Sequence, residues 1–149
     1  MSSKIKLIFF HPYSYIGGAD NSLRRLIENL DNNLFSITFL SLNNSYLRKI
    51  LSKKVTFITL KAKRTFHSIP ELKSIIKKYE DNKAYKKVIL ISNQNFANIV
   101  VSFSVSDNSS VKTIFIDRNH LDELNFYKSF KDKFILSPYF ATLYSQKHQ

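Results

Sequence analysis

Hydrophobic residues in this chain alternate between short continuous runs and stripes with helical spacing. Five runs predict strands, at Lys4–Phe10, Ser36–Leu42, Val55–Leu60, Lys87–Ile91 and Val111–Ile116. Mostly apolar runs of this length are typical of central parallel strands, which are buried on both faces of a sheet.

Between the runs, apolar residues recur at i, i+3, i+4 and i+7, the spacing of one helix face. Such stripes begin at Leu23, Leu72 and Phe96. A short helix is expected around Leu47–Leu51, and two more over the ranges 121–130 and 138–146.

Polar residues mark two of the helix starts. Asp20, Asn21 or Ser22 is expected to cap the first long helix, because short polar side chains accept hydrogen bonds from free backbone N–H groups. Ser68 and Glu71 have the spacing of a capping box before the Leu72 stripe.

The strict alternation of strands and helices predicts the fold class. It indicates an α/β protein with a Rossmann-like, doubly wound parallel sheet, forming a single three-layer domain over residues 1–149. Folds of this class bind ligands at the carboxyl ends of their strands, near the point where the strand order reverses. The residues that follow each strand are therefore the candidate site.

The two glycines of the chain are adjacent, Gly17 and Gly18, and lie between the first strand and the first helix. Glycine adopts positive φ readily and lets another group approach the backbone. A strand, a glycine pair and a helix N-terminus form an anion site in many α/β proteins, so a phosphate site is one interpretation. A tight turn without a ligand is the other.

Polar residues follow the first, fourth and fifth strands, over the ranges 11–20, 92–98 and 117–120. The topology brings these three clusters to one edge of the sheet, which favours a ligand crevice. Asparagine is also common in caps and turns, so each cluster alone fits a purely structural role. The residues expected to contact a ligand are Gly17, Gly18, Asn93, Asn95, Arg118, Asn119 and His120.

Composition limits the classes of protein that remain. With 149 residues and 44% hydrophobic positions, the chain is long and apolar enough to bury a core. It has no cysteine, which excludes disulfides and thiolate metal sites and fits a reducing compartment. The apolar run behind Lys4 and Lys6 ends at His11-Pro12 and is too short for a signal peptide, so we expect a cytoplasmic protein, soluble or peripheral on the inner face of the membrane.

The net charge of +12 is concentrated in one block. No acidic residue occurs between Asp31 and Glu71. An anionic membrane surface, a phosphorylated substrate, nucleic acid or a merely solvated face would each explain the block, and the absence of a recognised module disfavours nucleic acid. The membrane-facing candidates are Arg48, Lys49, Lys53, Lys54, Lys61, Lys63 and Arg64.

Several familiar chemistries have no counterpart in the sequence. The glycine pair is neither the dinucleotide fingerprint nor a Walker A loop, and no histidine spacing matches a zinc site. We therefore assign no catalytic residue, no metal and no cofactor.

Three motifs resemble the N-terminal domain of a GT-B glycosyltransferase of family 4. That family has Gly-Gly-Ala-Glu before a helix, matched by Gly17-Gly18-Ala19-Asp20. It has Ser-His-x-x-x-Ala-Asn after strand four, where this chain reads Ser92-Asn93-Gln94-Asn95-Phe96-Ala97-Asn98, and Glu-Arg-Asn after strand five, where this chain reads Asp117-Arg118-Asn119. Asp20 and Asn93 depart from the family's glutamate and histidine. The resemblance extends from Lys4 to about Tyr144.

The resemblance implies retaining transfer of a sugar from a nucleotide-sugar donor to a glycan or lipid-linked acceptor, as in cell-envelope polysaccharide synthesis. The N-terminal domain of such enzymes mainly holds the acceptor, and its glycine loop faces the donor diphosphate. By analogy, Gly17 and Gly18 would approach the phosphates, while Arg118, Asn119 or His120 would touch a sugar. Members that act on lipid-linked acceptors often dock on membranes through basic and aromatic residues, which the block from Arg48 to Arg64 resembles.

Family members continue into a second domain that binds the nucleotide, and we expect this chain to lack it and to be inactive alone. The alternative function is a non-catalytic Rossmann-like module that binds an anionic partner in the same crevice.

Overall fold

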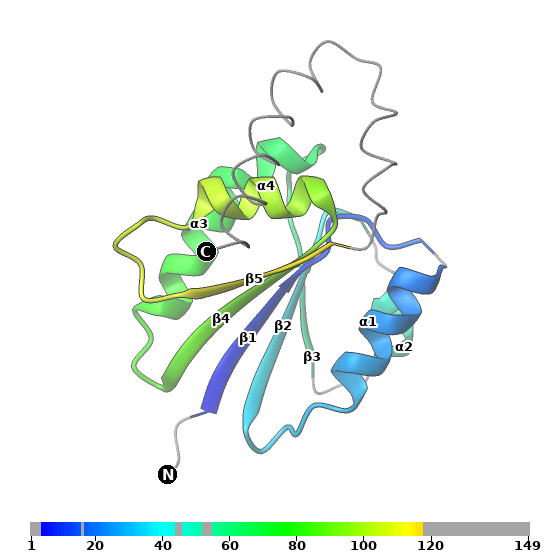
Figure 1. Cartoon of the computed structure of the whole chain (residues 1–149), viewed down its shortest axis with the longest axis horizontal. Helices are drawn as coiled ribbons and strands as arrows, with labels where there is room; N and C mark the ends of the chain where they lie inside the picture. Colours follow the sequence, from blue (N-terminus) through cyan, green and yellow to red (C-terminus); the bar gives the residue numbers. More distant parts are fainter. Residues whose placement is uncertain (1–3, 16, 44–45, 52–54, 118–149) are drawn as a thin grey trace, which may run out of the picture. The chain divides into compact units, whose positions relative to one another are not determined.

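The computed structural model describes residues 4–15, 17–43, 46–51 and 55–117, which lie within one compact unit of the chain, Met1–Arg118. Its centre is a five-stranded sheet in the order β3-β2-β1-β4-β5, with every neighbouring pair parallel (Figure 1). The strands are β1 (Lys4–Phe10), β2 (Phe35–Ser41), β3 (Val55–Thr59), β4 (Tyr85–Asn93) and β5 (Lys112–Ile116). The predicted α/β, Rossmann-like fold class is confirmed.

Helices cover both faces of the sheet (Figure 1). One face carries α1 and α2, and the other carries the short 3-10 helix η1 with α3 and α4. Their bounds are α1 (Gly18–Glu28), α2 (Tyr46–Ile50), η1 (Thr65–Ser68), α3 (Ile69–Glu80) and α4 (Asn95–Ser104). None of the helices in the described ranges is long and apolar enough to cross a membrane.

Alternating residues of β1 build two separate cores. Phe9 packs with Leu23 of α1, whereas Ile8 and Phe10 pack with residues of α3 and α4, such as Leu72. Because successive side chains of a strand point to opposite faces, a central strand must be apolar on both. Lys6 belongs by this alternation to the face of Ile8, and it is nevertheless buried.

The order of the strands reverses at β1. From β1 the chain winds outward through β2 to β3, then crosses back so that β4 pairs with the free edge of β1. The carboxyl ends of β1 and β4 are therefore the topological switch point, the position at which folds of this class commonly bind ligands.

Neither predicted side-chain cap forms, although Ser68 does occupy the N-cap position of α3. α1 begins at Gly18 with Gly17 as its N-cap and no side-chain cap, so Asp20 lies inside the first turn. At α3, the Ser68 hydroxyl donates to the Thr65 carbonyl (2.5 Å), and the Glu71 carboxylate accepts from the Lys61 backbone N–H (2.9 Å). Both side chains of the expected capping box thus bond other partners. The helices expected over 121–130 and 138–146 lie outside the described residues.

Candidate functional site

The carboxyl ends of β1 and β4 are joined through His11, which follows β1 directly. Its ring Nδ1 lies 3.1 Å from the Asn93 side-chain nitrogen and 3.3 Å from the Asn93 carbonyl oxygen. Both residues are about 1% exposed. His11 and Asn93, 82 positions apart, thereby fix two of the predicted strand-end clusters against each other.

The other ring nitrogen of His11 connects this junction to α1. Nε2 lies 2.9 Å from Asp20 Oδ1, and the Ser14 hydroxyl donates to the same oxygen at 2.8 Å. Asp20 and Ser14 are also buried. These contacts tie the loop between β1 and α1 to the helix, because His11 and Ser14 both bond Asp20 in the first turn of α1.

The chemistry of the pair assigns the proton of His11. With the proton on Nε2, the ring donates to the Asp20 carboxylate, and Nδ1 accepts from the Asn93 amide. A doubly protonated ring would keep the Nε2–H bond to the Asp20 carboxylate and would donate Nδ1–H to the Asn93 carbonyl. Since these groups are buried and bonded to one another, His11, Asp20 and Asn93 position the loop rather than present a reactive group.

The glycine pair does not have the predicted conformation. Neither glycine has positive φ, and Gly17 is fully extended (φ −158°, ψ −179°). What the structure offers is space, since a Cβ built on Gly18 would meet no heavy atom within 4 Å. The backbone at Gly18 is therefore open, as expected. The expectation that the glycines are needed for positive φ is wrong.

The strained residue of the site is Gln94, at the start of α4. It has φ 109° and ψ 146°, the one positive φ at a non-glycine residue in the described ranges. Its side-chain amide donates to the Tyr13 carbonyl (3.2 Å), and its backbone N–H bonds the Ile116 carbonyl (3.3 Å). Such strain persists only where surrounding contacts over-determine it, and it clusters at functional sites. The sequence contains no signal for this conformation.

The end of β5 meets the same edge through Asn98. Its amide nitrogen lies 3.4 Å from the Ile116 carbonyl, and its Oδ1 accepts from the Ser92 hydroxyl at 2.6 Å. Asn95, a predicted ligand contact, is buried in the first turn of α4. Of the remaining candidates, Arg118, Asn119 and His120 lie outside the described residues.

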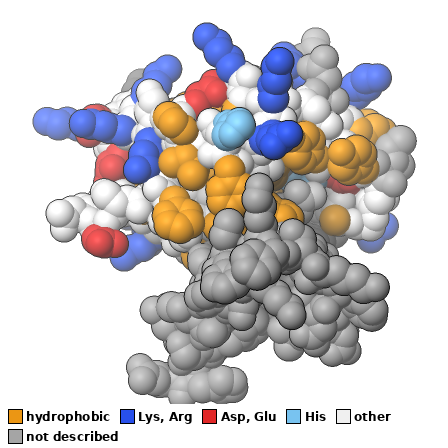
Figure 2. All heavy atoms as spheres, turned by 90° about the horizontal axis from the view of Figure 1, so that it is seen from above, with side chains coloured by type: hydrophobic (Ala, Val, Ile, Leu, Met, Phe, Trp, Pro, Cys, Tyr) orange, Lys and Arg blue, Asp and Glu red, His pale blue; other side chains and the backbone are white. Residues whose placement is uncertain are grey.

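Aromatic side chains are exposed above this edge (Figure 2). Tyr15 is 70% exposed and stacks on Tyr13, whose hydroxyl donates to the Lys63 carbonyl. Phe66 of η1 packs edge-to-face with Phe96 of α4, with the ring centroids 6.2 Å apart. Figure 2 shows hydrophobic side chains among lysines and arginines on the face seen from above.

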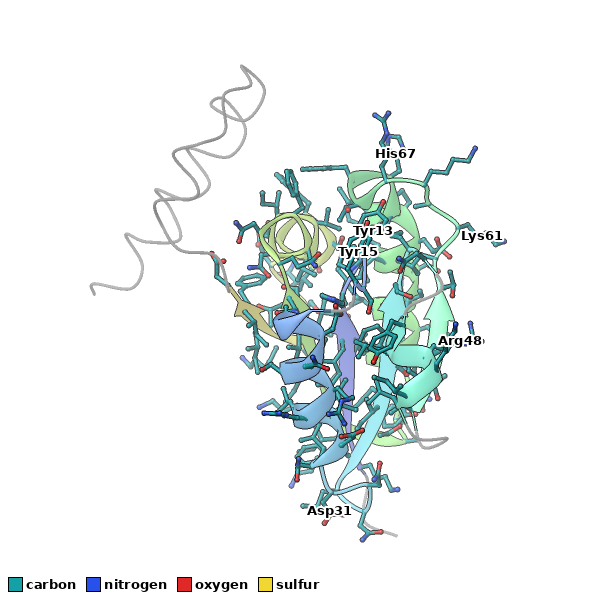
Figure 3. All side chains as sticks on the ribbon, turned by 90° about the vertical axis from the view of Figure 1, so that its right-hand side faces the viewer. Tyr13, Tyr15, Asp31, Arg48, Lys61 and His67 are labelled. Atoms are coloured by element: carbon teal, nitrogen blue, oxygen red, sulfur yellow. The ribbon has the colours of Figure 1, made fainter. Side chains whose placement is uncertain are left out.

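The described residues of the predicted basic block lie at two levels of the molecule. Figure 3 shows Arg48 of α2 partway down the molecule, whereas Lys61 and His67 lie at the carboxyl end with Tyr13 and Tyr15. The strand Val55–Thr59 separates the two groups along the chain. Exposed members at the carboxyl end are Lys61, Lys63 and Arg64, and exposed members on α2 are Arg48 and Lys49; Lys53 and Lys54 lie outside the described residues.

Within the part of the chain that the structure describes, no group of three histidines or carboxylates is placed to hold a metal ion. Comparison of the chain with protein-family models, with curated proteins and with solved structures finds no match.

Proposed function

We propose that this chain is the acceptor-binding half of a retaining glycosyltransferase, and that the α1 N-terminus beside β1 and β4 faces the phosphates of a nucleotide-sugar donor. The observation that carries the proposal is the open, uncapped N-terminus of α1 at the switch point of the sheet. The free N–H groups of a helix N-terminus and its positive dipole end favour an anion there.

In this proposal the buried polar cluster holds the loop in its open form. Asp20 anchors the first turn of α1 to His11, and Gln94 ties Tyr13 to α4. Gly18 contributes its backbone, which a phosphate approaches without meeting a Cβ. None of these residues transfers a proton, and the donor itself is held by a second domain. The glycan or lipid-linked acceptor lies at the same edge, with Arg118, Asn119 and His120 as its proposed contacts.

The second candidate is a non-catalytic module that binds an anionic partner in the same crevice. It is favoured by the mutual satisfaction of His11, Asp20, Ser14 and Asn93, which leaves no buried side chain of this cluster free for chemistry. Both candidates need the same open backbone at Gly18, and they differ in whether a sugar is transferred.

The experiment has two stages. In the first, pyrophosphate is titrated into the labelled chain while the amide resonances of residues 17–20 are followed; Gly18→Val should weaken binding about tenfold or more, because its side chain occupies the anion's approach. Gly18→Ala keeps the helix geometry and adds only a Cβ, so its effect on binding should be smaller than that of Gly18→Val. Equal binding by wild type and Gly18→Val would exclude a phosphate at this turn.

The second stage separates the two candidates. The chain is mixed with a nucleotide-sugar-binding domain of a family 4 glycosyltransferase, and transfer or hydrolysis of the nucleotide sugar is measured. Holding donor and acceptor in the reactive orientation lowers the activation barrier by about 7–11 kcal/mol. The chain alone cannot hold the donor in the proposed scheme, so it should show no turnover. Turnover that is lost in Gly18→Val supports the glycosyltransferase, whereas anion binding without turnover supports the binding module.

A membrane contact is proposed for the aromatic carboxyl end. Phe66 and Phe96 are 37% and 39% exposed there, and Lys61, Lys63 and Arg64 precede η1. Each cation near an anionic bilayer contributes about 1 kcal/mol of binding free energy. Three cations together with the inserted aromatic rings are enough for reversible binding. Sedimentation should show binding to anionic vesicles that falls with salt and is lost in Lys61→Gln/Lys63→Gln, but not in Arg48→Gln/Lys49→Gln. Equal binding to neutral vesicles would contradict it.

A further inference from the structure

A hollow of about 570 Å³ opens at the amino end of the sheet, opposite the carboxyl edge described above. Lys4 and Tyr85 line it from the first residues of β1 and β4, Asn33 lines it from the segment before β2, and Ser36 lines it from β2 itself. Five of the seven lining residues have a side chain with a hydrogen-bond donor, the exceptions being Phe35 and Ala84. The hollow is therefore suited to a ligand rich in acceptors.

The buried ammonium of Lys6 lies directly behind this wall. Its Nζ is 3.1 Å from Ser36 Oγ, 5.2 Å from the centroid of the Tyr85 ring and 4.5 Å from that of Tyr79. Lys6 is 2% exposed, and no carboxylate of the described residues forms an ion pair with it. A buried charge without a counter-ion is costly, and two aromatic faces and one hydroxyl replace only part of its hydration.

Ser36 lies between the Lys6 ammonium and the hollow. Because its Oγ accepts a hydrogen bond from the Lys6 ammonium, its own hydroxyl proton is left to donate, and that proton has no acceptor among the described residues. The Lys4 ammonium adds a second positive charge at the rim, where it donates to the Asn32 carbonyl at 2.7 Å. Two positive charges and an oriented hydroxyl match an oxyanion with two negative charges.

We propose that this hollow binds a phosphate group, with Lys4 and the Ser36 hydroxyl contacting its oxygens and with the phosphate as the counter-charge that Lys6, behind Ser36, otherwise lacks. The site is independent of the proposed function, because it lies at the other end of the strands and uses none of the loops at the carboxyl edge. Burial lowers the pKa of Lys6 from 10.5 to about 8. A bound phosphate stabilises the ammonium and should move this pKa back upward.

The test follows the Lys6 side chain itself, so that phosphate bound at Gly18 does not interfere. The ε-carbon resonance of Lys6 is titrated with pH in inorganic phosphate, and in chloride and acetate at equal ionic strength. Phosphate should raise the Lys6 pKa by about one unit, and chloride should not. The Gly18→Val variant should respond like wild type. An unchanged Lys6 pKa in phosphate overturns the proposal and leaves the carboxyl edge untouched.

Binding affinities of variants provide the second measurement. Lys6→Met and Ser36→Ala should each weaken phosphate binding at this site about tenfold, the usual effect of losing a charge-assisted hydrogen bond. Lys112→Met, an exposed lysine of β5, is the matched control and should bind as wild type. Retained affinity in Lys6→Met would refute the proposal. A phosphate monoester serves as the second probe: tighter binding identifies a phosphorylated compound as the ligand, and weaker binding identifies the free ion.

Discussion

Replacement of Lys6 by methionine should stabilise the fold, and the gain should vanish at high pH. Burial lowers the pKa of Lys6 to about 8 from 10.5, so at neutral pH the folded state holds its ammonium at a cost of about 3 kcal/mol. Methionine has a similar shape and no charge, but it loses the bond to Ser36, which contributes about 1 kcal/mol. The net gain is about 2 kcal/mol at pH 7, or about 4–8 °C in Tm.

The pH dependence follows from the direction of the shift. Below pH 8 Lys6 is protonated in the folded and the unfolded state, so the folded wild type is destabilised by the full cost of the buried ammonium. Between pH 8 and about 10.5 the unfolded state binds more protons than the folded state, and the stability of wild type therefore rises with pH relative to the variant. The difference between the two proteins should narrow across that window and reverse above it, where wild type is the more stable by the bond to Ser36, about 1 kcal/mol.

Urea unfolding of wild type, Lys6→Met and Lys112→Met at a series of pH values provides the assay. Tyrosines and other lysines titrate in the same range, but they cancel in the difference between wild type and Lys6→Met. Lys112 is exposed on β5, and its replacement should change stability by less than about 0.5 kcal/mol at every pH. A Lys6→Met protein that is less stable than wild type at pH 7, or a gap that stays constant to pH 10, would refute the reasoning.

Three further outcomes concern the carboxyl edge, each measured as a free energy of unfolding in urea. Gly18→Ala should stabilise by about 0.4–1 kcal/mol, because α1 begins there without positive φ and a Cβ meets nothing; a loss of stability would contradict this. His11→Ala should cost about 3–5 kcal/mol by leaving Asp20 buried without its partner, while Asp20→Asn should cost less; equal costs would mean that the charge is irrelevant. Gln94→Gly should stabilise by about 1 kcal/mol, since the relief of its backbone strain exceeds the lost bond to Tyr13, and a destabilised variant would show that the bond dominates.

The sheet was predictable from the sequence because burial on both faces leaves a continuous apolar signal. The run Lys4–Phe10 coincides with β1, whereas β4 begins at Tyr85, two residues before its predicted start. Its first three residues, Tyr85, Lys86 and Lys87, lie beyond the core and are not buried, so hydrophobicity alone does not mark them as strand.

Side-chain partners were less predictable, because they depend on residues far away in the chain. Asp20, Asn21 or Ser22 was expected to cap α1, but folding places His11 and Ser14 against Asp20, and the helix begins earlier, at Gly18. Lys6 interrupts an apolar run, and only the positions of Tyr79 and Ser36 reveal that it is buried. The backbone of Gln94 is set by the tertiary contacts of its neighbours rather than by its residue type.

The central place of β1 has a consequence for synthesis. β1 leaves the ribosome before either of its neighbours, and one of these is β4, which ends at Asn93. At about 5–20 residues per second, several seconds pass between the appearance of the two strands. During that interval one edge of an apolar strand has no partner and is open to pairing with other chains. Slow translation ahead of residue 93 should therefore favour aggregation of nascent chains, and a chaperone that covers β1 should prevent it.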